Sequence, residues 1–237
     1  MTPRLFCAAL ALVGLTVTAA CATGSASTTE DPADATPDDA APTPTGTVPR
    51  DASAPETGAE ASTQGLRRPG AGEVVFTEMM INPDGVSDEF GEWVELYNTT
   101  DTPLGLAQCR LSDESSPKDD REIDRDVVVP AKSAIVLGRS ASAAANGGLS
   151  GVTFEYGNGF VLANTGDSAI LTCNGVVVDR VDFTSTWPFG KGVTMQVKQS
   201  ARNATANDTP GNWCLATLSF GTGAQKGTPG NTQNHCP

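Results

Sequence analysis

Side chains that commonly carry out chemistry at neutral pH are scarce in this sequence. Its single histidine, His235, stands close to the C-terminus, and no serine lies in a GxSxG motif. A serine or cysteine nucleophile needs a neighbouring base, most often histidine, so acyl transfer through such a triad is not expected. The glycine-rich GxxxxGK[ST] loop and a strand-linked GxGxxG, which hold nucleotide phosphates, are also missing. The sequence therefore predicts no catalytic residues, and we expect a protein that is not an enzyme.

Positive charge is also in short supply. Lysine and arginine number 15 against 28 aspartates and glutamates, which gives a formal net charge of -13. Binding to nucleic acid depends on contacts between cations and phosphates and on the release of counterions. Because the cations are outnumbered and not segregated along the chain, nucleic acid is not an expected partner.

Long apolar runs are confined to the N-terminus. Arg4 precedes an apolar stretch from Leu5 to Val17, and small residues then lead to Cys21. This pattern is typical of a secretory signal, here residues 1–20, and it is shorter than the roughly 20 apolar residues of a membrane-spanning helix. The small residues before Cys21 resemble a bacterial lipobox, which implies cleavage before Cys21 and a lipid on its sulfur. The alternative is an ordinary signal with Cys21 incidental.

Large apolar residues are nearly missing from residues 22–71, which consist mostly of Ala, Thr, Pro, Ser, Asp and Glu. Such a segment cannot bury enough surface to offset the entropy of ordering, so it is predicted to be a disordered acidic linker. Its prolines and mutually repelling charges favour extended conformations. Residues 21–71 are therefore interpreted as a lipidated cysteine followed by a spacer between the membrane and a domain at residues 72–237.

Four cysteines remain beyond the signal and Cys21, namely Cys109, Cys173, Cys214 and Cys236. An even number in an exported chain favours two disulfides. Four cysteines allow three pairings, which the sequence does not decide. Proximity favours Cys214 with Cys236, leaving Cys109 with Cys173. A zinc site is disfavoured because the chain has no CxxC pair and one histidine.

Short apolar or alternating runs separated by Gly, Pro, Asn and Asp fill the rest of the chain. We predict strands there, at residues 73–80, 92–98, 107–112, 123–128, 133–138, 159–163, 168–173, 176–183 and 193–197. An Asn-Gly pair at 174–175 favours a type I′ hairpin turn. This number of short strands in one domain indicates an all-β antiparallel sandwich with a single core.

The motifs of this region, read in order, resemble the lamin tail domain family. They are TEMMINP (77–83), GEWVELYN (91–98), CRLSD (109–113), VVVPAKSAIVLGR (127–139), GFVLANTGDSAIL (159–171), VVDRVDF (177–183) and TPGN (209–212). The resemblance implies an immunoglobulin-like β-sandwich. Cys109 stands where bacterial members often have tryptophan, and a second TPGN occurs at 228–231. We expect the residues from Trp213 onward to form a C-terminal extension of the same domain.

Three glutamates in the most motif-like strands are the candidates for acid–base chemistry. Alternation within GEWVELYN puts Glu95 on the face of Trp93 and Tyr97, and Glu92 on the opposite face. Together with Glu78, this pattern favours strand-edge or cross-strand charge pairing over a catalytic cleft.

The loop NPDGVSDEFGE offers Asp84, Asp88 and Glu89 as oxygen ligands for calcium. It lacks the ligand spacing of an EF-hand, and the alternative is a solvated acidic loop. No other cofactor is expected.

Two large aromatic residues, Trp187 and Phe189, occur in the segment WPFGK and could form an exposed interaction surface. The alternative is that they belong to the core.

These features predict a lipid-anchored, non-enzymatic protein of the bacterial cell envelope, with the outer membrane or the cell surface favoured. Its sandwich is expected to serve as a binding or structural module that contacts an envelope protein or a polysaccharide. The resemblance also implies an alternative, an accessory module that acts with a separate secreted hydrolase such as a nuclease.

Overall fold

The computed structural model describes residues 65–114, 119–222, 225–233 and 236. The predicted signal peptide at 1–20, Cys21, the linker up to residue 64 and His235 lie outside the described residues. Within the described ranges, no helix is long and apolar enough to cross a membrane.

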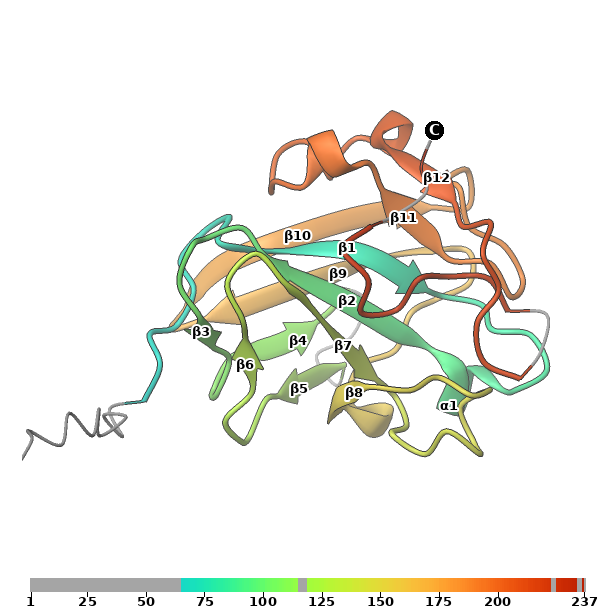
Figure 1. Cartoon of the computed structure of the whole chain (residues 1–237), viewed down its shortest axis with the longest axis horizontal. Helices are drawn as coiled ribbons and strands as arrows, with labels where there is room; N and C mark the ends of the chain where they lie inside the picture. The colour runs from blue at the N-terminus through green and yellow to red at the C-terminus, as the bar shows by residue number, and fades with distance from the viewer. Residues whose placement is uncertain (1–64, 115–118, 223–224, 234–235, 237) are drawn as a thin grey trace, which may run out of the picture. The chain divides into compact units, whose positions relative to one another are not determined.

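The larger of the two main sheets has six strands in the order β12-β11-β1-β2-β7-β8 (Figure 1). All neighbours are antiparallel except β7 and β8. Its strands are β1 (Val74–Met80), β2 (Trp93–Asn98), β7 (Ala134–Gly138), β8 (Val152–Glu155), β11 (Met195–Val197) and β12 (Trp213–Leu215).

The smaller sheet has four strands in the order β10-β9-β4-β5, and a third, two-stranded sheet pairs β3 with β6. The bounds are β3 (Leu104–Gly105), β4 (Arg110–Ser112), β5 (Asp120–Glu122), β6 (Val128–Val129), β9 (Gly166–Cys173) and β10 (Val176–Thr184). Among the described residues, the helical elements are α1 (Asp88–Gly91) and three 3-10 turns at Gly157–Gly159, Gln199–Ala201 and Pro210–Asn212. The all-β, immunoglobulin-like antiparallel sandwich is confirmed.

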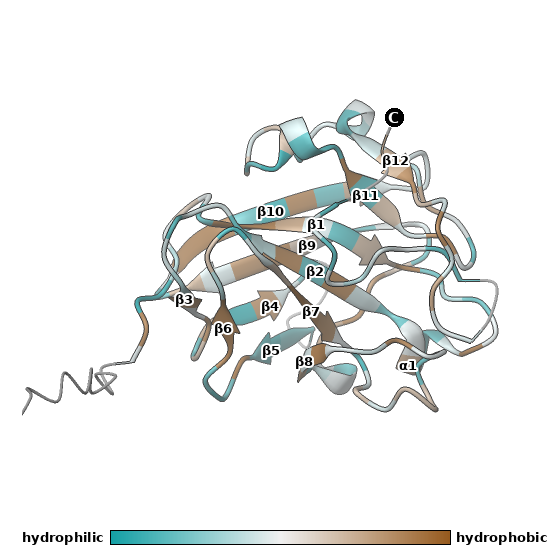
Figure 2. Cartoon of the chain, viewed as in Figure 1, coloured by the Kyte–Doolittle hydropathy of each residue, from teal (hydrophilic) through white to brown (hydrophobic). Residues whose placement is uncertain are grey.

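The main hydrophobic core lies between the sheets, and a smaller cluster is formed by Met80, Trp93, Val136 and Leu149. Val94 and Leu96 of β2 enter the main core from one side, and Leu171 of β9 and Val181 of β10 enter it from the other. Apolar and polar residues alternate along β10, whereas β7 is apolar along most of its length (Figure 2). This pattern follows from position, because β10 has one solvated face while β7 is covered on both.

The turn between β9 and β10 is the sharpest local prediction, and it is confirmed. Cys173 pairs with Val176 across the hairpin, and Asn174 and Gly175 both have positive φ, 50° and 75°. A type I′ turn requires positive φ at both central residues, which Asn and Gly tolerate best.

Two predicted strands are wrong. Residues 123–127 form a loop between β5 and β6. Ile123 and Val127 are buried there, whereas the charged residues between them face solvent. Residues 160–163 are also a loop, although Phe160 and Leu162 are buried. The Leu162 N–H donates to the Glu92 carboxylate at 3.3 Å, so its hydrogen bond does not require a neighbouring strand. The short strands β3, β5, β8 and β12 were not predicted.

Both ends of the sandwich extend beyond the segment with the strongest strand pattern. The Gly105 N–H donates to the Arg67 carbonyl at 2.9 Å, and Arg67 forms an ion pair with Glu73 at 2.5 Å. Contacts of the sandwich therefore begin before residue 72. At the other end β11 pairs with β1 and β12 pairs with β11, so the C-terminal extension adds the edge strand β12 to the larger sheet.

Candidate binding site

Residues 225–231, here called the C-terminal strap, cover the outer face of the six-stranded sheet (Figure 1). The strap contains the second TPGN motif. Its Thr228 N–H donates to Glu78 Oε1 at 2.8 Å, and its Gly230 N–H donates to Glu95 Oε2 at 2.8 Å. Two backbone groups of the strap are thus fixed by carboxylates that project from β1 and β2.

Glu78 and Glu95 are cross-strand partners, and both side chains are buried, with exposed fractions of 1% and 2%. The Thr194 hydroxyl donates to Glu78 at 2.6 Å, and the Thr77 hydroxyl donates to Glu95 at 2.6 Å. Each carboxylate oxygen of Glu95 therefore accepts a hydrogen bond from within the protein. This arrangement gives the pair a structural role in holding the strap.

Burial governs the protonation of this pair. Removal from water and the negative charge of Glu78 together raise the pKa of Glu95 to about 8, against the opposing effect of the donors from Thr77 and Gly230. Burial likewise raises the pKa of Glu78, against donors from Thr194 and Thr228. Two carboxyls this close cannot both ionise easily, so the pair holds at least one proton near neutral pH.

Glu92 makes a separate, buried ion pair at the end of β2. Its Oε2 lies 3.2 Å from Arg139 Nη1, and the two side chains are 1% and 8% exposed. Burial raises the pKa of Glu92 to about 8, although the charge of Arg139 lowers it. Arg139 Nη2 also donates to Asn158 at 2.7 Å. These contacts join β2 to the loops after β7 and β8.

Another buried carboxylate, which the sequence analysis missed, links β10 to β1. Asp179 Oδ2 accepts from the Phe76 N–H at 2.8 Å and from Asn207 Nδ2 at 2.7 Å. Burial raises the pKa of Asp179 to about 7 against these donors. The register of β1 and β2 shifts just after Phe76, so Asp179 supplies a partner for strand backbone at this irregularity.

The proposed calcium ligands are not brought together. Asp84 pairs with Lys191 at 2.9 Å, and Asp88 accepts from Asn164 at 2.8 Å. Glu89 is exposed on α1. Within the part of the chain that the structure describes, no group of three or more His, Cys, Asp or Glu residues could hold a metal ion.

Of the two interpretations of Trp187 and Phe189, the structure supports packing against the core, with Trp187 buried and Phe189 partly buried. Trp187 is only 6% exposed and lies 6.0 Å from Trp213, measured between ring centroids. Phe189 packs against the core with its ring edge-on to Phe183. The apolar area of both rings is more stable inside the sandwich than in water, which decides their position.

The disulfide pairing favoured by proximity is confirmed. Cys109 is bonded to Cys173 and Cys214 to Cys236. The first bond lies in the smaller sheet beside β4 and at the end of β9. The second ties the chain just beyond the strap back to β12, which explains how a segment with so little apolar area stays on the sheet.

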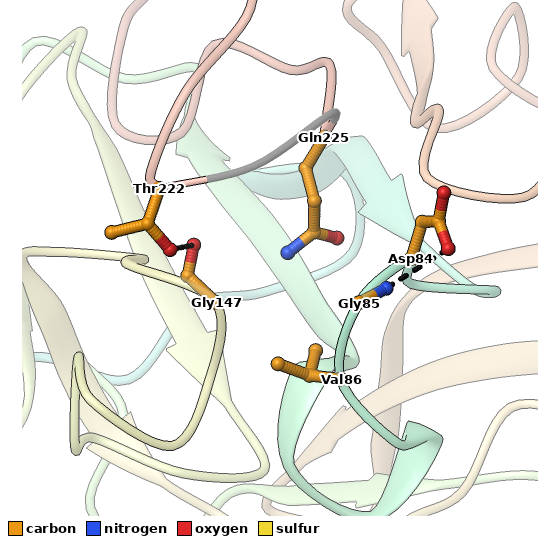
Figure 3. Close-up of a pocket in the computed structure, with 6 residues that line it drawn as sticks. All are labelled: Asp84, Gly85, Val86, Gly147, Thr222 and Gln225. Atoms are coloured by element: carbon orange, nitrogen blue, oxygen red, sulfur yellow. Dashed lines mark hydrogen bonds between the residues drawn. The ribbon is translucent and has the colours of Figure 1, made fainter.

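A pocket of about 210 Å³ opens where three loops meet at one end of the sandwich (Figure 3). The loops are the one after β1, the one after β7 and the segment leading into the strap. The described residues that line the pocket are Asp84, Gly85, Val86, Gly147, Thr222 and Gln225. Only Asp84 among them was singled out from the sequence. The others come from distant segments of the chain, so no local motif marks them.

Gln225 is the unusual member of this pocket. Its side chain points into the space between the three loops, and the residue is only 1% exposed (Figure 3). Both Nε2 and Oε1 are buried without a hydrogen-bond partner among the described residues. Buried amide groups are nearly always hydrogen-bonded, to protein or to ordered water, so this amide has capacity for a partner beyond the described residues.

A family model described as Lamin Tail Domain matches residues 67–185, which is half of the chain. Comparison with curated proteins finds no match. The matched segment runs from the first contacts of the sandwich through β10, and it includes Asp84, Val86 and Gly147. Strands β11 and β12, the strap, Thr222 and Gln225 lie beyond it, so the pocket combines matched and unmatched parts of the chain.

Proposed function

The chain belongs to the lamin tail domain family, and from that premise we propose that it is a lipid-anchored protein of the bacterial cell envelope. Its lamin tail domain would serve there as a binding or structural module without catalytic activity. The observation that supports this proposal is the order of three parts of the chain: a predicted secretory signal at residues 1–20 directly before Cys21, an acidic proline-rich segment, and the sandwich.

The anchor follows from the chemistry of the N-terminus. Each buried methylene of an acyl chain contributes about 0.8 kcal/mol, so two or three chains on one cysteine hold a protein on a membrane durably. The predicted spacer is rich in proline and in carboxylates, a composition that favours extended conformations. Such a spacer would let the sandwich reach a partner some distance from the bilayer.

A non-catalytic role is supported by the use of the acidic side chains. Glu78, Glu92 and Glu95 have the raised pKa values often found in catalytic acids. All three, however, are buried and engaged by internal donors or by Arg139. These internal contacts give each of the three carboxyls a structural role that needs no substrate.

Fatty-acid labelling in growing cells tests the anchor. We expect the wild type and Cys7→Ser to incorporate the label and to sediment with membranes, whereas Cys21→Ser incorporates none and becomes soluble. Cys7→Ser is the matched control, because Cys7 lies inside the predicted signal. Label on Cys21→Ser, or soluble wild type, would contradict the proposal.

Protease treatment of intact cells then tests the location. Loss of the sandwich while a periplasmic control protein survives indicates the cell surface. Survival of both until the outer barrier is opened indicates the periplasm. Hydrolytic turnover by purified residues 22–237 that disappears with one defined substitution would overturn the non-catalytic part.

A further inference from the structure

We propose that Thr228 of the strap and Gln196 of β11 form an intramolecular ester, with Glu78 of β1 as the base that activates the threonine. The bond would fasten the strap covalently to the six-stranded sheet. This modification goes beyond the proposed function and does not depend on the lipid anchor. It occurs once in each molecule and takes no substrate from outside, so it is compatible with a protein that has no catalytic turnover.

The three side chains meet beneath the strap. Glu78 and Gln196 are direct cross-strand partners in β1 and β11, so they project from the same face of the sheet. Thr228, the first residue of the second TPGN motif, contacts both of them from the strap. Gly227 permits this close approach, because a Cβ there would lie 2.7 Å from Glu78 Oε1. All three side chains belong to buried residues.

The hydroxyl of Thr228 has the surroundings of an activated nucleophile. It donates to Glu78 Oε2 at 2.8 Å. The other oxygen, Oε1, already accepts from the Thr228 N–H at 2.8 Å and from the Thr194 hydroxyl at 2.6 Å, so Oε2 is the oxygen that can take the hydroxyl proton. When the proton of the carboxyl pair resides on Glu95, Glu78 is the ionised member and serves as the base.

The side-chain amide of Gln196 is the electrophile. Its Nε2 donates to Thr228 Oγ1. Burial raises the pKa of Glu78, and the Gln196 amide is one of the donors that oppose this rise, which puts it near the base as well. Its Oε1 has no hydrogen-bond partner among the described residues, so only the contacts of Nε2 resist a turn of the amide about the Cγ–Cδ bond. That turn presents the face of Cδ to Thr228 Oγ1.

The proposed step balances in atoms and charge. Thr228 Oγ1 attacks Gln196 Cδ and forms a C–O bond while its proton passes to Glu78 Oε2. Glu78 then delivers the proton to Nε2, the Cδ–Nε2 bond breaks and ammonia leaves. The products are one ester and one ammonia, and Glu78 returns to its carboxylate form, so no cofactor is consumed. Fixed positions raise the effective concentration of the reacting groups, and burial limits the access of water that would hydrolyse the ester.

Peptide mapping by mass spectrometry tests this bond in the full-length protein purified from cells, after the disulfides are reduced and alkylated. Trypsin cleaves after Lys and Arg, so it releases Gln196 within residues 192–198 and Thr228 within residues 227–237. We expect these two peptides to remain joined, with a combined mass lower by one ammonia. Hydroxylamine cleaves esters but not amides, so it should separate the joined peptides and leave a hydroxamate at position 196.

Three variants identify the groups. Thr228→Val removes the nucleophile at nearly constant shape, and Glu78→Gln removes the base, so both should give separate peptides in which Gln196 is still an amide. Thr209→Val is the matched control, because Thr209 is the exposed first residue of the other TPGN motif, and it should keep the bond. If a variant fails to fold, the wild-type peptides and their response to hydroxylamine decide.

Three results would overturn the proposal: separate wild-type peptides with Gln196 intact, a joined pair that resists hydroxylamine, or a joined pair in Thr228→Val. None of them bears on whether Cys21 is acylated or on what the sandwich binds, so failure here is distinct from failure of the envelope proposal.

Discussion

Replacing Glu95 by glutamine should make the protein more stable at neutral pH and remove part of its pH dependence. In the folded state burial raises the pKa of Glu95 from 4.5 to about 8. The folded protein therefore binds a proton that the unfolded chain releases above pH 4.5. Stability from this group is complete below the unfolded pKa and is lost as pH rises through the folded pKa.

The size of the effect follows from the difference between the two pKa values. One pKa unit corresponds to about 1.4 kcal/mol, so protonating Glu95 in the fold costs roughly 3 kcal/mol at pH 7 and roughly 5 kcal/mol at pH 8 or above. A glutamine needs no proton. Its Oε1 can accept from the Gly230 N–H and its Nε2 can donate to the Thr77 hydroxyl, which rotates to accept.

Urea unfolding measures this free energy for the wild type and Glu95→Gln. It is done at several pH values between 4 and 8 with the disulfides intact. We expect equal free energies of unfolding near pH 4 and a variant that is more stable by roughly 3 kcal/mol at pH 7. Glu89→Gln, at an exposed position on α1, is the control and should follow the wild type. Parallel curves for wild type and Glu95→Gln would refute the reasoning, since Glu95 would then not hold its proton in the fold.

Other perturbations test the remaining buried contacts. Asp179→Ala removes the acceptor of two buried donors, the Phe76 N–H and Asn207 Nδ2. Urea unfolding should show a free energy of unfolding lower by about 3 kcal/mol. The control Asp126→Ala, at an exposed position, should change it little. Replacing the Cys109–Cys173 pair by serines should destabilise by about 4 kcal/mol and replacing Cys214–Cys236 by about 3 kcal/mol, because the closed loops differ in length; calorimetry checks the order. Gly175→Ala forces a positive φ on a residue with a Cβ and should lower the stability by about 1 kcal/mol in urea, without changing the pH dependence.

The fold class could be predicted because it depends on local patterns. Apolar alternation marks the long strands β1, β2, β9 and β10, and the Asn174–Gly175 turn fixes the register of one hairpin. The short strands escaped prediction, since a strand such as β8 of four residues is defined by its partner β7 and not by its own sequence.

The candidate site could be predicted only in part. Alternation placed Glu95 and Trp93 on one face of β2, as the structure has them, but did not reveal that the strap covers this face. The sequence left open whether Trp187 is exposed or belongs to the core, and the structure places it in the core near Trp213, where its apolar area is removed from water. Gln225 carried no signal, since a single glutamine is ordinary until the fold buries it.

By itself, then, the sequence determined the antiparallel sandwich, the Asn-Gly hairpin and the family resemblance, because these rest on residue type and on period along the chain. Tertiary structure alone decided which carboxyls lose contact with water and which amide is left without a partner. Burial and pairing are properties of segments far apart in sequence: Glu78 meets Thr228, and Asp84 shares a pocket with Gln225. No local pattern encodes such meetings, so the pKa values and the pocket appear only once the chain is folded.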